Sequence, residues 1–153
     1  MEKILAVLGG ASLLVVGVVA LVGWSGGCGR GHGHGHGRDP AQVAAFVTDR
    51  VDDALDDVDA TPEQRTRIHA VKERMLAAGQ ALRAGRAEAH DAVFAEWKAE
   101  RPDAAKLHAL VDAQAEELKA LAHQAVDAGV EVHDILTPEQ REKLTRKMER
   151  WHR

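Results

Sequence analysis

The five-residue string Thr-Pro-Glu-Gln-Arg occurs twice in this chain, at residues 61–65 and again at residues 137–141. Threonine is a favoured N-cap, and proline fits the first helical position. A glutamine three residues after the cap can return a hydrogen bond to the cap's backbone. Each copy therefore predicts the start of a helix. Leu136 precedes the second copy, whereas Ala60 precedes the first.

The composition from residue 41 onward extends the helical prediction to the rest of the chain. Alanine, leucine, glutamate, lysine, glutamine and arginine dominate there, and these are strong helix formers. Aromatic residues make up 3% of the chain and tyrosine is missing, whereas β-sandwiches and barrels depend on aromatic and β-branched strands. We therefore expect an all-α protein. A net charge of −4 with interspersed bases disfavours nucleic acid as a partner.

Four helices are expected in a domain covering residues 40–153. The second is expected to run from residue 61 to about residue 101, with Gly79 and Gly85 weakening its middle and favouring a bend. The third starts at Pro102-Asp103 and the fourth at residue 137. Short connections make successive helices antiparallel. The first helix opens at Asp39-Pro40, and its apolar face repeats at spacings of three and four: Val43, Phe46 or Val47, Val51, Ala54 or Leu55, and Val58.

Large apolar side chains are scarce on the long predicted helices, whose stripes are rich in alanine. A monomer would therefore have a modest core, which favours a homodimer with the long helices packed together. We expect most of the larger apolar residues to belong to the core. The alternative is that these residues form an exposed apolar surface with a charged rim, which binds unfolded proteins (clients). The residues concerned are Met75, Val93, Phe94, Trp97, Met148 and Trp151.

The N-terminal residues 1–27 are expected to form a membrane anchor or a signal segment. Residues 4–22 contain no charge and are long enough to span a bilayer as a helix, with Trp24 placed for the interface. A cleaved signal peptide is the alternative, although its apolar region is usually shorter. Cleavage before Cys28 would make that residue a candidate for lipidation, but Ser-Gly-Gly-Cys is a poor signal for it. Cys28 is the only cysteine, so no intramolecular disulfide can form.

A linker of glycine alternating with histidine occupies residues 28–39. Glycine in alternation forbids a stable helix, and His32, His34 and His36 are therefore carried on a pliable backbone. Imidazole suits zinc, nickel and copper, so we expect these three residues to bind a divalent transition metal. The alternative is a solvated tether that meets metal only incidentally.

The two capping strings resemble the LTxxQ motif of the Spy/CpxP family and of the related periplasmic heavy-metal sensor and resistor proteins. The matching residues are Thr61, Pro62, Glu63 and Gln64 in the first copy, and Leu136, Thr137, Pro138, Glu139 and Gln140 in the second. The resemblance covers roughly residues 41–153. It implies a four-helix hooked body, an antiparallel homodimer, and an inner-membrane anchor facing the periplasm of a Gram-negative bacterium.

The resemblance also implies one of three roles. Some relatives shield unfolded clients without ATP, some bind heavy metals, and CpxP-like relatives regulate a membrane sensor kinase. Within the helices, three histidines have an acid one turn later, and each pair is a weaker candidate metal site: His69 with Glu73, His108 with Asp112, and His123 with Asp127. Surface salt bridging is the simpler interpretation of these pairs.

No hydrolase, phosphate-loop or metalloprotease motif occurs, so we do not expect an enzyme. The sequence therefore predicts an envelope-stress or heavy-metal response protein that binds metal through histidines and shields unfolded clients. A chaperone without a physiological metal role is the alternative.

Overall fold

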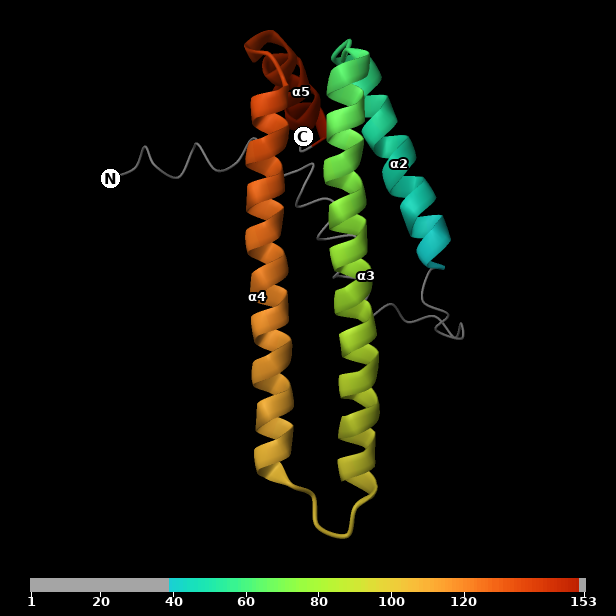
Figure 1. The fold of residues 1–153 in the computed structure, drawn as a ribbon, viewed down its shortest axis with the longest axis vertical. Helices are drawn as coiled ribbons and strands as arrows, with labels where there is room; N and C mark the ends of the chain where they lie inside the picture. The colour runs from blue at the N-terminus through green and yellow to red at the C-terminus, as the bar shows by residue number, and fades with distance from the viewer. Residues whose placement is uncertain (1–38, 152–153) are drawn as a thin grey trace, which may run out of the picture.

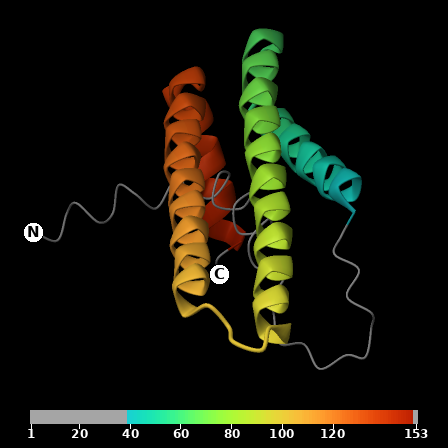
Figure 2. The same cartoon turned by 60° about the horizontal axis from the view of Figure 1, so that its bottom comes forward.

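A computed structural model describes residues 39–151 of the chain, which form helices α2 (Pro40–Asp57), α3 (Pro62–Lys98), α4 (Ala104–Ile135) and α5 (Pro138–Trp151). The helices α3 and α4 form a long antiparallel hairpin (Figure 1). The shorter α2 and α5 fold back beside one end of this hairpin, which we call the hooked end (Figures 1 and 2). The all-helical prediction is confirmed. None of the described helices is long and apolar enough to cross a membrane, and the predicted anchor lies outside the described residues.

Local capping accounts for where three of the helices begin. The Asp39 carboxylate accepts a hydrogen bond from the backbone of Ala41, with Pro40 at the first helical position. Asp103 caps α4 in the same way by accepting from the backbone of Ala105 and Lys106. Thr61 caps α3, as its sequence context predicts.

The turn between α3 and α4 begins earlier than the sequence indicates. The helix α3 ends at Lys98 rather than near residue 101. Glu96 explains the difference, because its carboxylate accepts a hydrogen bond from the backbone of Asp103 and forms an ion pair with Lys106. These two contacts draw the start of α4 back onto the last turn of α3. The glycines do not interrupt α3, and Gly85 lies against the carboxylate of Glu117 on α4.

The core lies entirely at the hooked end. One buried cluster joins α2 to the first part of α3 and the end of α4, and includes Val47, Leu55 and Ile68, with Leu144 of α5 packed against it. A second cluster lies within the hairpin and ends at Leu82 on α3 and Leu121 on α4. Val47 rather than Phe46 faces the core, since Phe46 remains 42% exposed. Apolar burial in these clusters is the main favourable term that holds the four helices together.

Candidate functional site: a paired capping motif and an uncovered hairpin

Each copy of the repeated string forms a complete capping box. The hydroxyl of Thr61 accepts a hydrogen bond from the backbone of Gln64, whose amide oxygen accepts from the backbone of Thr61 at 2.9 Å. Thr137 and Gln140 repeat this arrangement, again with 2.9 Å between the threonine nitrogen and the glutamine oxygen and 3.3 Å for the bond to the hydroxyl. Each box satisfies donors that a helix start would otherwise leave unpaired.

The two glutamines also bond to each other across the fold. The amide nitrogen of Gln64 donates to the amide oxygen of Gln140 at 2.8 Å, and Gln140 donates back at 3.0 Å. Each amide nitrogen makes a further bond to a backbone carbonyl of the opposite turn, at Ile135 from Gln64 and at Asp59 from Gln140. All side-chain donors and acceptors of the buried Gln140 and the half-buried Gln64 are therefore used, and the pair joins the turns that precede α3 and α5.

The arginine that ends each string has a role that sequence reasoning missed. Arg65 donates to the carbonyl of Ala60, and Arg141 donates to the carbonyl of Leu136, which is the residue before the threonine in both copies. Ala60 and Leu136 are both buried in the core cluster at the hooked end. The signal was present in the sequence, because the identity of the two copies extends to the arginine.

Charged contacts reinforce the same region. Lys143 of α5 donates to the carboxylate of Asp59, in the turn before α3, and lies 2.6 Å from it. This hydrogen bond and the positive charge of Lys143 hold the pKa of Asp59 below its usual 3.8. The pKa values of Glu63 and Glu139 are also lowered, first by hydrogen bonds from their own backbone amides and then by the neighbouring threonine hydroxyls.

The weaker candidate metal residues on the helices make no ion pair or hydrogen bond within their predicted pairs among the described contacts. His69 pairs with Asp52 of α2 at 3.0 Å, while Glu73 pairs with Lys72. The pairs His108 with Asp112 and His123 with Asp127 are exposed on α4, with no hydrogen bond within either pair among the described contacts. Over residues 39–151, no group of three or more His, Cys, Asp or Glu is arranged to hold a metal ion. The linker residues His32, His34 and His36, and Cys28, lie outside the described residues.

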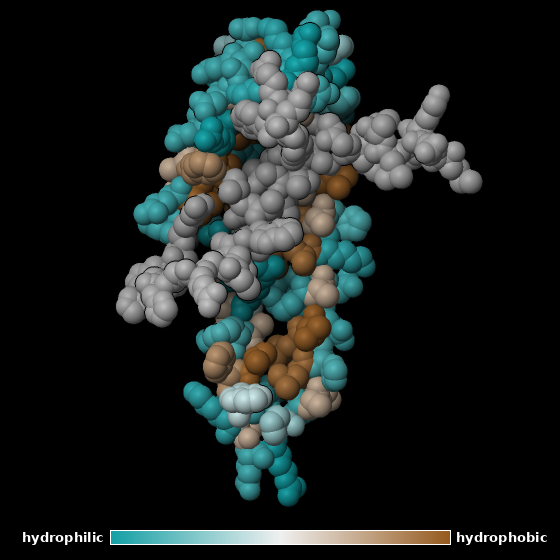
Figure 3. All heavy atoms as spheres, turned by 180° about the vertical axis from the view of Figure 1, so that it is seen from behind, coloured by the Kyte–Doolittle hydropathy of each residue, from teal (hydrophilic) through white to brown (hydrophobic). Residues whose placement is uncertain are grey.

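Beyond the core, the hairpin is uncovered. Within the distal half, which we define as residues 83–120, every residue is at least partly exposed. The space-filling view shows apolar side chains gathered on one face of this part of the molecule (Figure 3). The largest exposed apolar residues of the distal half are Val93, Phe94 and Trp97 on α3, and Val111 and Leu118 on α4.

This exposure corrects part of the core prediction. Met75 and Met148 are buried as expected, but Val93, Phe94 and Trp97 are not. The reason is that α2 and α5 are too short to reach the distal half, so two helices face each other there with nothing packed across them. A helical stripe shows which side chains share a face, but not whether a partner covers that face.

A small cavity lies between the helices of the hooked end. Its volume is about 50 Å³ and its lining is apolar apart from Lys72, whose ammonium group donates to the hydroxyl of Thr48. Small-molecule sites usually measure about 300–1,000 Å³. This cavity holds at most a small side chain, so the open surface of the distal half is the larger candidate binding site.

The family model described as LTXXQ motif family protein matches residues 46–148, which is most of the chain. The chain belongs to this family. It is the Spy/CpxP-type family, as the paired strings predict. No curated protein and no solved structure matches the chain. In this LTXXQ protein, the matched region contains both capping boxes and the uncovered hairpin between them.

The glutamine pair is expected to be energetically coupled. Replacing Gln64 or Gln140 with Ala removes both reciprocal bonds and leaves one donor and one acceptor position of the other amide unpaired. Each single change should lower the free energy of unfolding by about 1–3 kcal/mol. The double variant should cost less than the sum, with a coupling of about 0.5–3 kcal/mol. Urea denaturation followed by circular dichroism measures all four proteins. Gln80→Ala, on an exposed face of α3, is the matched control. Additive costs would contradict a direct bond between the glutamines.

Acid should weaken the hooked end. Because the folded pKa of Asp59 is depressed, its contribution to stability is present above its usual pKa and is lost as the pH falls through the folded value. The melting temperature should therefore drop between about pH 5 and pH 2, and Asp59→Asn should reduce that drop. Asp49→Asn is the control, because Asp49 has no ion pair within the described part of the chain. An equal fall in melting temperature in both variants would show that the ionisation of Asp59 does not cause the acid sensitivity.

Proposed function

We propose that this LTXXQ protein is an envelope-stress protein that shields unfolded clients on the distal half of its hairpin. In this proposal the N-terminal segment holds it at the inner membrane, facing the periplasm of a Gram-negative bacterium. Membership of the Spy/CpxP-type family and the uncharged residues 4–22 support this arrangement. The proposal assigns no catalytic step to the chain.

The exposed apolar surface of the distal half carries the proposal. Trp97 is 82% exposed and Val111 is 66% exposed, and both lie among charged neighbours. A soluble protein rarely exposes several large apolar side chains in one region unless they bind something. Unfolded proteins expose the complementary apolar segments. Binding through burial of apolar area needs no ATP, because the favourable term comes from the release of surface from water.

The same surface supports the expected homodimer. A two-helix hairpin buries little apolar area by itself, and a second copy along it would supply the missing third and fourth helices. Self-association and client binding would then draw on neighbouring parts of one surface. We therefore propose a homodimer whose contact lies on the hairpin, and sedimentation analysis of the variants described below tests it.

Metal binding by the histidine linker is a second candidate function. It rests on the sequence, where His32, His34 and His36 alternate with glycine next to the helical domain. Zinc, nickel and copper are the metals that such donors favour. We propose that metal uptake, if it accompanies client protection, depends on the linker and not on the helices.

The client-binding surface can be tested by making it polar. The triple variant Val93→Ser, Phe94→Ser and Trp97→Ser should need several-fold more protein to suppress aggregation of an unfolded client to half. Its free energy of unfolding should change by less than about 1 kcal/mol, because exposed substitutions cost little. The control is Val126→Ser with Val130→Ser, which removes two exposed apolar residues from α4 at the hooked end. Unchanged suppression by the triple variant would count against the proposal.

The metal proposal predicts where the donors lie. Deleting residues 31–37 should abolish most zinc uptake in calorimetric titration and leave the helical circular dichroism intact. The comparison protein carries His69→Gln, His108→Gln and His123→Gln, and should keep wild-type affinity. The reverse result, with binding lost only in the triple substitution, would place the metal site on the helices.

A further inference from the structure

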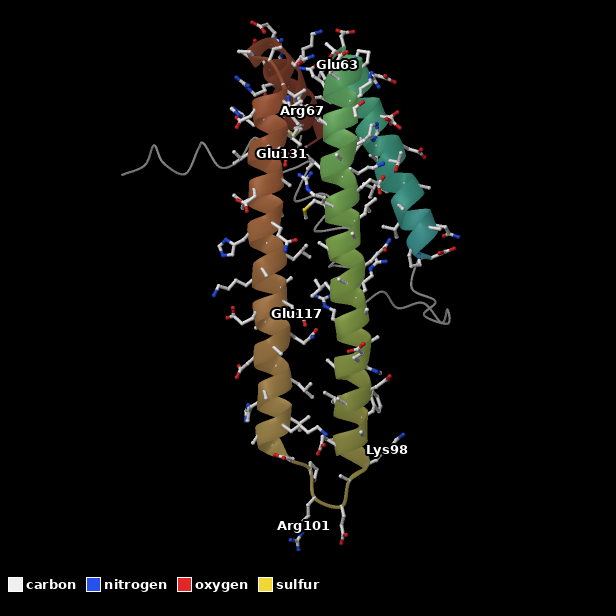
Figure 4. All side chains as sticks on the ribbon, in the orientation of Figure 1. Glu63, Arg67, Lys98, Arg101, Glu117 and Glu131 are labelled. Atoms are coloured by element: carbon white, nitrogen blue, oxygen red, sulfur yellow. The ribbon has the colours of Figure 1, made fainter. Side chains whose placement is uncertain are left out.

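The closed end of the hairpin, residues 97–106, carries an exposed aromatic residue beside two outward-pointing bases. We call this end the tip. Trp97 lies in the last turn of α3 and is the most exposed of the large apolar residues that the structure describes. Lys98 and Arg101 point away from the body of the hairpin (Figure 4). Neither base has an ion pair or a side-chain hydrogen bond within residues 39–151.

The acids near the tip are mostly engaged within the fold. The Glu96 side chain pairs with Lys106 and accepts a hydrogen bond from the backbone of Asp103. Asp103 in turn caps α4. Three charged residues of the turn make no side-chain hydrogen bond or ion pair among the described residues: the bases Lys98 and Arg101 and the acid Glu100. The outward side of the tip therefore presents two bases without an ion-pair partner among the described residues, Lys98 and Arg101, next to the indole ring of Trp97.

The tether predicted from the sequence can bring this tip to the membrane. The first residue of α2, Pro40, lies at the end of that helix that is nearer the tip (Figure 1). At 1.5 Å per residue, α2 is about 27 Å long and α3 about 55 Å, so Pro40 lies roughly 30 Å from the tip along the hairpin. Residues 23–39 span up to about 55 Å when extended. The tip is therefore within reach of a bilayer that holds residues 4–22.

We propose that the tip docks on the surface of this bilayer, with Trp97 in the interfacial layer and with Lys98 and Arg101 against anionic lipid headgroups. The proposal rests on the membrane attachment proposed above. Tryptophan favours the membrane interface because its ring is apolar while its N–H needs a polar partner. Each base near an anionic surface contributes about fivefold to binding. The tether adds a high effective concentration of lipid, which a free protein partner lacks.

Bromolipid quenching of tryptophan fluorescence tests this docking in the full chain. Two single-tryptophan proteins are reconstituted into vesicles with brominated acyl chains, with and without phosphatidylglycerol. One carries Trp24→Phe and Trp151→Phe, so that only Trp97 emits. The other carries Trp97→Phe and Trp151→Phe, so that only Trp24 emits. We expect Trp24 to be quenched in both vesicles, and Trp97 to be quenched more strongly when the anionic lipid is present.

Charge variants in the Trp97 protein measure the headgroup contact. Lys98→Gln with Arg101→Gln should lower the ratio of docked to undocked tip on anionic vesicles at least fivefold. Arg83→Gln with Arg86→Gln removes the same charge from α3 away from the tip, and should leave the ratio unchanged. An equal loss in both charge variants would show a general effect of net charge and would overturn the headgroup contact.

The two tryptophans separate failure of docking from failure of attachment. Quenching of Trp24 without quenching of Trp97 would overturn docking and leave the attachment standing. An unquenched Trp24 would contradict the proposed membrane attachment. Quenching of Trp97 would then still show docking of the tip, and no quenching of Trp97 would overturn it. A blue shift of Trp97 that grows with protein density, without bromine quenching, would mean that the tip packs against a second copy and would also overturn the proposal.

Discussion

The hydrogen bonds between Gln64 and Gln140 join two turns that are far apart in the chain. The amide oxygen of each glutamine accepts one hydrogen bond from its own helix cap. Its other hydrogen bonds go to the other glutamine and to the opposite turn. The capping boxes would form locally in any helix, but the reciprocal bonds form only when the turns meet. Because α2 leads into one turn and α5 follows the other, this contact brings both short helices to the same end of the hairpin. The core clusters then form where those helices lie.

The distal half of the hairpin stays helical for a different reason. None of its residues is fully buried, so apolar packing contributes less to its order than at the hooked end. Local contacts stabilise this half: Asp103 caps α4, and the ion pair between Glu96 and Lys106, which we call the clamp, joins the two sides of the turn. The clamp lowers the pKa of Glu96 and raises that of Lys106, since each charge stabilises the other through their hydrogen bond. A hairpin held by its own ends can expose apolar side chains along its length without unfolding.

Features that depend on neighbours in the sequence were predictable, and features that depend on distant partners were not. The starts of α3 and α5 follow from Thr61 and Thr137, because a capping box is complete within four residues. The bond from Gln64 to Gln140 does not follow, because either glutamine is already explained by its own cap. Spacing likewise paired His69 with Glu73, whereas the fold supplied Asp52 from α2. The exposure of Phe94 was missed for the same reason, because periodicity does not report the length of the covering helices.

The separation of the two ends has a consequence for how this LTXXQ protein can change. The buried clusters lie at the hooked end, while most of the exposed large apolar residues lie beyond Leu82 and Leu121. Effects of distant substitutions are usually additive, so the distal half can alter its apolar character with little cost to the hooked end. Most of the exposed apolar surface and the buried clusters therefore lie on different halves of one hairpin. The buried clusters and the glutamine pair stabilise the hooked end, so the fold constrains the composition of the distal half only weakly.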